Sequence, residues 1–325
     1  MVLPAALPSP LVTLTDPELA GAGIELRLKR DDLIAPGGIS GNKWRKLVPN
    51  LRAALAEGHT RLLTFGGAWS HHIHAVAAAA AACGLTSVGV IRGDELADAP
   101  RNWSLAEAER NGMELAFVDR RAYRETLAHL DDPATRGRIE RRWGRCYVLP
   151  EGGSNALAAR GTAGLVEELP GLGPRDLVCC PVGTGGTLAG IAAALPAGAR
   201  AWGVAVLKGA AGYLEDEVAR LHRSGWARTF PNWHISHTHH GGGYARLPAA
   251  LTAFASAFEE RHGLAIEPRY VAKMLHCVYD TAPALPRGTR VTAVITGPPH
   301  APATDREGAG PGPAPGRAGA PGPSR

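Results

Sequence analysis

This sequence lacks the marks of a secreted or membrane-spanning protein. Its five cysteines form an odd, widely spaced set without a CxxC pair, and 325 residues are far more than a small disulfide-stapled scaffold contains. The most apolar stretch, residues 77–82, is too short to cross a bilayer. The N-terminal segment has no basic start and is interrupted by prolines, so it does not resemble a signal peptide. We therefore expect a cytoplasmic protein without a membrane partner.

The sequence also lacks a strong excess of charge of either sign. The formal net charge is +5 at pH 7, and the basic residues are scattered rather than gathered in a block interleaved with aromatic residues. A nucleic-acid partner is therefore not expected, while a local positive site for an anionic cofactor or substrate stays open. The 45% hydrophobic and 20% charged residues are typical of a soluble globular protein, and the length is enough for two lobes.

Two kinds of segment alternate after the first 40 residues. Short apolar or β-branched runs bounded by glycine or proline predict strands at residues 61–65, 87–91, 176–181, 201–206 and 290–295. Stretches rich in alanine and leucine predict helices between them, at residues 51–57, 72–83, 105–111, 161–168, 188–195 and 251–262. This alternation is typical of βαβ units, so the sequence predicts an α/β fold with mainly parallel sheets.

Two segments depart from this alternation. Residues 120–145 are densely charged and predict helix that is exposed to solvent. From residue 298 onward the chain consists mostly of glycine, proline, alanine and arginine, which cannot bury enough apolar surface to offset the entropy lost on ordering. We therefore expect the folded part to end near Gly297 and residues 298–325 to form a disordered tail.

A turn rich in glycine and threonine carries the most specific chemistry. The segment from Pro181 to Thr187 reads PVGTGGT, directly after a predicted strand and directly before a predicted helix. Glycines let backbone amides converge on one point, and the helix start adds unpaired N–H groups and the positive end of the helix dipole. The turn predicts a phosphate cradle with Thr184 and Thr187 as further donors; a tight turn without a ligand is the alternative. It is neither a Walker loop nor a dinucleotide fingerprint, because no Gly-Lys-Ser/Thr follows and Leu188 replaces the third glycine.

A second segment places a lysine after a run of glycines. Residues 38–47 read GISGNKWRKL, and the glycines before Lys43 allow close approach to a bulky ligand. A lysine that forms a Schiff base must be neutral at neutral pH, which burial or a neighbouring cation favours. Arg45 and Lys46 are candidates for that cation, or they face water, as basic residues at a helix start commonly do.

Three further segments are candidates for the walls of a site. Ser70 precedes a predicted helix, so we expect it to cap that helix and to offer a hydroxyl beside free amides that could hold a carboxylate. The segment PEGGSN at residues 150–155 is either a capped loop or another wall. His237 and His239 would share one face of a strand, but no carboxylate or cysteine nearby in the sequence completes a ligand set. We therefore expect no metal site there, and instead a loop that leads to Tyr244 at the mouth of the site.

Taken together, these segments resemble the 1-aminocyclopropane-1-carboxylate deaminase and D-cysteine desulfhydrase family, pyridoxal-phosphate enzymes of the tryptophan synthase β-like class. The resemblance extends from about residue 7 to residue 297, through motifs in a consistent order: KRDDL, SGNKWRKL, FGGAWSHHIHA, LPEGGSNALAARG, PVGTGGT, GGGYA and EPRYVAKMLHCVYD. It implies a homodimer of two-lobed chains, each lobe a mainly parallel sheet flanked by helices. Residues 1–46 with 150–297 would form the large lobe that binds pyridoxal 5'-phosphate, and residues 47–149 the small lobe.

The resemblance also implies roles for individual residues. Lys43 would hold the cofactor as a Schiff base and act in catalysis, and Ser70 would lie near the substrate carboxylate. Tyr244 and Tyr270 would be tyrosines on the substrate side of the site. On the cofactor side, His71 would contact the phenolic oxygen and Thr296 the pyridine nitrogen. The phosphate would be bound by the glycine-threonine turn, that is, by Gly183, Thr184, Gly185, Gly186 and Thr187.

Three positions depart from the family pattern. His71 stands where the family has asparagine, and Pro298, which fixes φ and removes an amide donor, stands where a glycine is expected. Val271 stands where the deaminases carry glutamate and the desulfhydrases threonine. Because valine offers neither charge nor hydroxyl, this position favours simple elimination over ring opening, which needs extra acid–base groups.

The expected function is that of a lyase or deaminase that eliminates the β-substituent of a small amino acid resembling D-cysteine. Its products would be a 2-oxo acid and ammonia. Three alternatives stay open: opening of the 1-aminocyclopropane-1-carboxylate ring, β-replacement by an added nucleophile, and cofactor binding with little turnover. A nucleotide-binding protein is not supported, since it would leave Lys43 without a role.

Overall fold

The computed structural model describes residues 4–39, 41–243 and 246–299. Tyr244 and nearly all of the tail predicted at residues 298–325 lie outside these residues. None of the described helices is long and apolar enough to cross a membrane.

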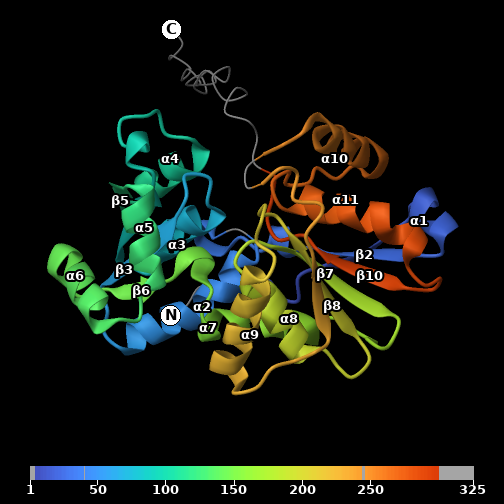
Figure 1. Ribbon diagram of the computed structural model, residues 1–325, viewed down its shortest axis with the longest axis horizontal. Coiled ribbons are helices and arrows are strands. Elements are labelled where there is room, and N and C mark those ends of the chain that lie inside the picture. The colour runs from blue at the N-terminus through green and yellow to red at the C-terminus, as the bar shows by residue number, and fades with distance from the viewer. Residues whose placement is uncertain (1–3, 40, 244–245, 300–325) are drawn as a thin grey trace, which may run out of the picture.

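The described residues form two sheets, and the larger one has six strands in the order β1-β2-β10-β7-β8-β9. These strands are β1 (Leu11–Leu14), β2 (Glu25–Lys29), β7 (Asp176–Val182), β8 (Arg200–Ala205), β9 (Trp233–Ser236) and β10 (Arg290–Val294). Only β1 pairs antiparallel, with β2, and all other neighbours are parallel. The order places the early strand β2 beside the late strand β10, so both ends of the described chain contribute to one sheet (Figure 1).

The smaller sheet has four parallel strands in the order β5-β4-β3-β6. They are β3 (Arg61–Gly66), β4 (Thr86–Arg92), β5 (Met113–Val118) and β6 (Tyr147–Leu149). The predicted α/β fold with mainly parallel sheets is therefore confirmed. The predicted boundary after residue 46 falls inside helix α2 (Lys43–Ala56), and the division into lobes at that residue stays a prediction.

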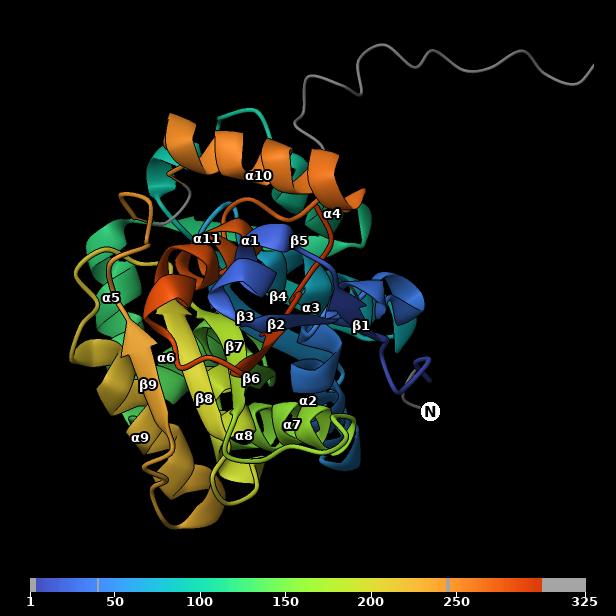
Figure 2. The same cartoon turned by 90° about the vertical axis from the view of Figure 1, so that its right-hand side faces the viewer.

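Helices flank both sheets (Figures 1 and 2). Around the smaller sheet lie α3 (His71–Ala82), α4 (Trp103–Arg110), α5 (Arg120–Ala128) and α6 (Pro133–Trp143). The others are α1 (Pro17–Ala22), α7 (Ala156–Glu167), α8 (Gly186–Ala194), α9 (Tyr213–Trp226), α10 (Ala249–His262) and α11 (Val271–Thr281). Each predicted strand and helix is present, although α2 begins at Lys43, well before residue 51. Helices α5 and α6 account for the densely charged segment, as expected.

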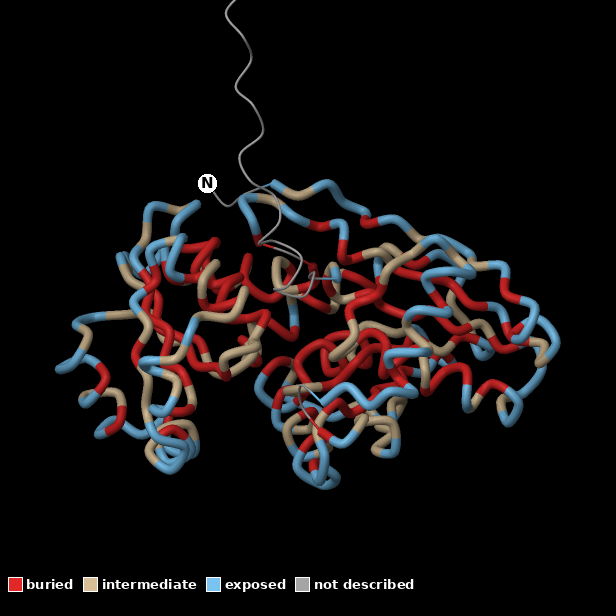
Figure 3. The backbone as a smooth tube through the Cα atoms, turned by 90° about the horizontal axis from the view of Figure 1, so that it is seen from above, coloured by how far each residue is buried: buried red, intermediate tan, exposed pale blue. Residues whose placement is uncertain are grey.

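Both faces of the larger sheet are buried. Along β7, Cys179 packs in the apolar cluster that contains Met274 of α11, whereas Cys180 packs in the cluster that contains Leu188 of α8. Successive side chains of a strand point to opposite faces, so the two thiols belong to two different apolar layers. Figure 3 shows the result, with buried backbone running through both halves of the molecule and exposed segments at the periphery.

Candidate active site

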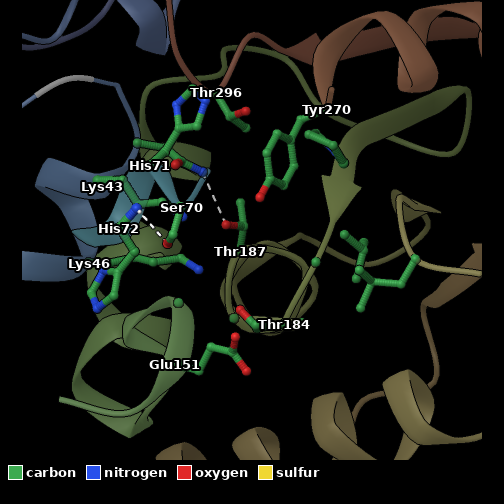
Figure 4. A pocket seen from close by; sticks show the side chains of 18 of the residues that line it. Lys43, Lys46, Ser70, His71, His72, Glu151, Thr184, Thr187, Tyr270 and Thr296 are labelled. Carbon is green, nitrogen blue, oxygen red and sulfur yellow. Dashed lines mark hydrogen bonds between the residues drawn. The ribbon is translucent and has the colours of Figure 1, made fainter. Parts of the chain in front are cut away.

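A cavity of about 290 Å³ lies where the carboxyl ends of strands from both sheets meet. Its walls come from the turns after β3 and β7, the end of β4, the segment after β10, the first turn of α2, the N-cap of α11 and the 3₁₀ turn Glu151–Gly153. Ligands of open parallel sheets bind at such edges, and clefts between sheets are common sites. Figure 4 shows side chains from these segments converging on the cavity.

The glycine-threonine turn forms one wall. Gly185, the N-cap of α8, has a φ of 76°, a conformation that favours glycine. A Cβ atom on Gly186 would lie 2.7 Å from Ser154 Oγ and 3.1 Å from Lys46 Nζ, so a larger residue would displace both groups. All of residues 183–187 line the cavity, beside the N-terminus of α8. The turn therefore has the shape and the donors of a phosphate cradle.

Hydrogen bonds tie this turn to its neighbours. Thr184 Oγ1 lies 2.6 Å from Ser154 Oγ, and Asn42 Nδ2 donates to Thr187 Oγ1 over 3.1 Å. The segment at residues 150–155 is thus a wall of the cavity as well as a turn, since Glu151 and Gly152 also line it.

Lys43 enters the cavity from the first turn of α2. The Asn42 N–H donates to Thr296 O over 2.9 Å, and a Cβ atom on Gly41 would lie 2.1 Å from the same oxygen. The close approach that only glycine permits therefore holds the start of α2 against the end of β10. Burial lowers the pKa of Lys43 to about 8, so a larger fraction of its amine is neutral near physiological pH than for an exposed lysine.

Lys46, one turn further along α2, lines the same cavity and reaches toward the glycine-threonine turn (Figure 4). Burial and then the nearby charge of Lys43 lower the pKa of Lys46 well below its ordinary value. The sequence left open whether Lys46 faces water, and the structure answers that it does not. An anion in the cradle would supply the negative charge that stabilises its protonated form.

Arg45 points to a different group of buried charges, which we call the Arg45 cluster: Ser9, Lys29, Asp31, Arg45 and Glu168. The Arg45 guanidinium donates twice to Asp31, over 2.8 and 2.9 Å, and twice to Glu168, over 2.8 Å each. Burial alone would raise the pKa of Glu168, but bonds from Arg45 and Lys29 outweigh it and lower that pKa. The cluster fixes the first turn of α2, and with it Lys43, to β2 and α7.

Ser70 lies at the opposite wall. It is the N-cap of α3 and accepts the N–H of His72 over 3.2 Å, as the sequence predicts. Its own carbonyl accepts from Ser104 Oγ of α4 over 3.0 Å, which holds the turn in place. The Ser70 hydroxyl therefore sits beside the positive end of a helix, where a carboxylate is stabilised.

His72 follows Ser70 and is buried against the smaller sheet. Its Nε2 lies 2.8 Å from Thr64 Oγ1, and a Cβ atom on Gly153 would lie 2.8 Å from its Cε1. Burial, followed by the charges of Lys43 and Lys46, lowers the pKa of His72 well below its ordinary value. The imidazole is therefore neutral at the edge of the cavity.

His71 faces an aromatic group. Its ring centroid lies 5.6 Å from Tyr270 and 5.3 Å from Trp103, both edge to face. Its Nε2 lies 3.9 Å from Glu267 Oε1, a buried carboxylate that accepts the N–H groups of Arg269 and Tyr270 and whose pKa is raised by burial. Tyr270 and Thr296 also line the cavity.

Val271, in contrast, is fully buried in the apolar cluster of α11 rather than in the cavity wall. Sequence reasoning did not identify Arg92 or Tyr213, which line the cavity from the end of β4 and from α9. The Arg92 guanidinium lies over the ring of Tyr123, and its Nη2 would be 3.4 Å from a Cβ atom on Gly67. It adds positive charge on the side of the turn that carries Ser70.

Lysine is rare in this chain. There are five: Lys29, Lys43, Lys46, Lys208 and Lys273. Lys29, Lys46 and Lys273 are buried, Lys43 lines the cavity and Lys208 is exposed. Among the described residues, Lys43 and Lys46 are thus the only lysines of the cavity wall.

The histidines after β9 do not behave as predicted. Because β9 ends at Ser236, His237 and His239 lie beyond the strand and do not share a strand face. His237 Nε2 lies 2.7 Å from Glu215 Oε1, whereas His239 Nε2 lies 3.0 Å from Asp280 Oδ2. Tyr244, the substrate-side tyrosine of the resemblance, is outside the described residues.

Comparison with known proteins identifies relatives. A putative 1-aminocyclopropane-1-carboxylate deaminase of Thermotoga maritima is 37% identical over 176 residues, which are 53% of this chain and 54% of the relative. A second protein of that description, from Pyrococcus horikoshii, is 27% identical over 289 residues and 85% of each chain. A D-cysteine desulfhydrase of Salmonella paratyphi B is 35% identical over 205 residues, 58% of each chain. The matches to the Thermotoga and Salmonella relatives thus span little more than half of their length.

Solved structures share the fold. The crystal structure of a homologue of 1-aminocyclopropane-1-carboxylate deaminase superposes with a TM-score of 0.77 and 24% identity, covering 91% of this chain and 90% of the other. A hydrogen sulfide-producing enzyme from Fusobacterium nucleatum superposes with a TM-score of 0.60 and 14% identity, covering 90% and 94%.

The family model described as "Pyridoxal-phosphate dependent enzyme" matches residues 2–297, nearly the whole described chain. Its extent agrees with the segments that form both sheets and the cavity between them. The resemblance inferred from the motifs is therefore confirmed, and the chain belongs to the family of pyridoxal-phosphate dependent enzymes.

Proposed function

We propose that this chain uses pyridoxal 5'-phosphate to eliminate the β-substituent of a small amino acid resembling D-cysteine, with release of a 2-oxo acid and ammonia. The observation that carries this proposal is that one cavity combines Lys43, the phosphate cradle and the Ser70 turn. Relatives named as D-cysteine desulfhydrase and as putative 1-aminocyclopropane-1-carboxylate deaminase support the reaction class.

The residues present fit the cofactor. A phosphate dianion needs convergent donors, and residues 183–187 offer backbone amides at the start of α8 together with the hydroxyl of Thr187. Lys46 adds a cation at the same turn, and a Cβ atom on Gly186 would fill the space between them. The family resemblance would place His71 near the phenolic oxygen of the cofactor and Thr296 near the pyridine nitrogen, and both residues line this cavity.

Lys43 carries the proton chemistry. Pyridoxal phosphate, when bound, supplies an electron-withdrawing ring that makes the Cα proton of an amino acid removable. Lys43 would hold the cofactor through Nζ, and its neutral amine would accept the Cα proton of the substrate. A pKa of about 8 suits this role, because the amine is a competent base near neutrality. Loss of this proton from Cα and of the β-substituent, a thiolate for D-cysteine, followed by hydrolysis, would give pyruvate and ammonia.

The opposite wall suits the carboxylate of the substrate. The Ser70 hydroxyl lies beside the N-terminus of α3, and Arg92 adds positive charge on that side. Of the described residues in the cavity wall, Glu151 is the one carboxylic acid, and its neighbour Gly152 packs against Thr184 of the phosphate cradle. Val271 is buried and offers no acid group at the position where the resemblance places the glutamate of the deaminases, which favours elimination over ring opening.

The test is product analysis with the purified holoenzyme. We expect D-cysteine to yield pyruvate and sulfide, with little product from 1-aminocyclopropane-1-carboxylate. Lys43→Ala should abolish turnover, while Lys208→Ala, which changes an exposed lysine outside the cavity wall, should leave it unchanged. Bound cofactor without product from any small amino acid would refute the proposal, and product from the cyclopropane substrate alone would assign ring opening instead.

We also propose that the chain acts as a homodimer in the cytoplasm. The dimer is an expectation from the family resemblance, and light scattering of the holoenzyme gives its mass directly. Five cysteines without a disulfide support a reducing compartment.

A further inference from the structure

We propose that His239, His276 and Asp280 form a binding site for a divalent transition-metal ion, outside the cavity described above. Their ligand atoms all lie within 4.8 Å of one another. The site joins the segment after β9 to the C-terminal turns of α11. The proposal is independent of the elimination reaction.

Helix geometry supplies two of the three ligands. His276 and Asp280 are four residues apart on α11, a spacing that puts both side chains on one face of the helix. His239 arrives from the chain after β9, and its Nε2 already lies 3.0 Å from Asp280 Oδ2. The histidine that lacked a nearby carboxylate in the sequence thus gains one from 41 residues away.

Neighbouring groups hold both imidazoles in place. Thr238 Oγ1 lies 2.9 Å from His239 Nδ1, so when Nδ1–H donates to this hydroxyl the lone pair is on Nε2, which faces Asp280. A fixed partner on the second ring nitrogen is usual for metal-binding histidines. The His276 ring packs 5.1 Å from Phe254 of α10 and 5.6 Å from the His239 ring. Both rings are partly buried, which limits the entropy lost on binding an ion.

Two imidazoles and one carboxylate suit Zn²⁺, and also Co²⁺ or Ni²⁺. With metal–ligand bonds of about 2.0–2.2 Å, ligand atoms of a tetrahedral site are about 3.3 Å apart. Binding of an ion would therefore draw the ligand atoms closer than their present spacing, which is within 4.8 Å. The site also lies at the C-terminal turn of α11, where the partial negative charge of the helix favours a cation.

A simple ion pair between His239 and Asp280 does not account for His276. Among the described residues, the structure gives His276 ring contacts with His239 and Phe254 but no hydrogen-bond partner. The nearest lysine of α11, Lys273, is buried and donates to Gly243 O over 2.8 Å. Its ammonium is thus bound by a carbonyl oxygen.

The metal ion would cross-link the segment from His239 to Gly243 to helix α11. The segment from His239 to Gly243 contains three glycines with φ of 60°, 89° and 127°, so its conformation is weakly restricted by its own sequence. Lys273 binds this segment at Gly243, and the ion would bind it to the same helix at His239. Helix α11 begins at the cavity, with Tyr270 as its N-cap. The metal ion would therefore link the segment from His239 to Gly243, through α11, to a wall of the cavity.

The experiment is equilibrium dialysis of the holoenzyme, freed of metal with a chelator, against micromolar Zn²⁺. We expect about one equivalent of zinc per chain in the wild type and less than about a tenth in His276→Ala and in Asp280→Asn. The matched control is His234→Ala, which removes an exposed histidine of β9 that stacks on Trp202. It should keep the full equivalent. All variants retain Lys43, so any zinc held by the cofactor is the same in each.

Circular dichroism and the cofactor absorbance show that the variants fold, which keeps the zinc measurement interpretable. Absence of micromolar binding in the wild type overturns the proposal. Binding that persists in both His276→Ala and Asp280→Asn overturns it too, because it assigns the ion to other ligands. Neither result bears on the elimination chemistry, which is measured separately as pyruvate formation.

Discussion

Removal of the buried Arg45 guanidinium should lower the stability of the protein by several kcal/mol, about 3–5. Arg45 makes four hydrogen bonds to Asp31 and Glu168, whose side chains are 0% and 12% exposed. Breaking a buried ion pair from one side costs about 3–5 kcal/mol, because the remaining charges stay buried without a partner. In Arg45→Met the side-chain volume is nearly kept, so the loss measures charge rather than a cavity. Lys29 stays beside Glu168 and limits the loss at that carboxylate.

The assay is urea unfolding of the apoenzyme followed by circular dichroism. We expect the free energy of unfolding to fall by about 3–5 kcal/mol in Arg45→Met. The matched control is Arg121→Met, whose guanidinium forms an exposed pair with Glu125 over 2.8 Å. Exposed pairs at this helical spacing contribute only about 0.3–0.5 kcal/mol, so this variant should unfold almost as the wild type does.

A double variant tests the cause. If uncompensated charge dominates, Arg45→Met with Asp31→Asn should be more stable than Arg45→Met alone, because a buried carboxylate has been neutralised. A loss below about 1 kcal/mol in the single variant would refute the reasoning. So would a double variant that is less stable than the single one.

Further predictions follow from other described residues. Gly186→Ala should weaken cofactor binding at least about tenfold, measured by titration of the apoenzyme, since its Cβ would lie 2.7 Å from Ser154 Oγ; Gly164→Ala, with open space around it in α7, is the control and should bind normally. Labelling of Lys43 in the apoenzyme by an amine reagent should rise with pH and level off above about pH 8, because burial lowers its pKa to about 8; a profile still rising at pH 10 contradicts this. Burial opposes ionisation of Asp16, but bonds from Leu19 N–H, Arg261 and Tyr279 lower its pKa to about 2. Its contribution to stability is present above pH 4 and is lost as the pH falls toward 2, so the acid unfolding of Asp16→Asn should depend less on pH in this range than that of the wild type.

The elements that the sequence predicts correctly are those whose signal is local. The runs at residues 61–65 and 176–181 are continuously apolar, as is typical of strands buried on both faces of a parallel sheet. The signal of the glycine-threonine turn is equally local, because glycine, hydroxyl and helix start follow one another within seven residues, and phosphate binding by this turn stays a prediction. For such segments the rest of the chain adds little information.

The elements that the sequence misses depend on distant partners. Strand β2 reads ELRLK, yet Arg27 and Lys29 are buried in the larger sheet. Their burial is possible because Asp176 and Glu168, 149 and 139 residues away, accept their charge. Buried charges need partners, and a local pattern cannot show where a partner comes from.

The same limit applies to the site. Arg45 and Lys46 are neighbours of the same chemical class, and the sequence gives no reason to send one into an ion cluster and the other into the cavity. The helix geometry determines which of the two lines the cavity, because Lys46 is three residues after Lys43 and shares its face of α2. Likewise, the carboxylate beside His239 belongs to Asp280, which contacts it because the fold places α11 beside the segment after β9.

The burial of most lysines has a consequence for selectivity toward aldehydes. An aldehyde condenses with any accessible neutral amine, whereas a guanidinium stays protonated and does not react in this way. Among the described residues only Lys208 offers a lysine amine at the outer surface, and the other basic residues there are arginines and histidines. An aldehyde cofactor diffusing over the described surface therefore meets one exposed lysine before it enters the cavity that holds Lys43 and Lys46.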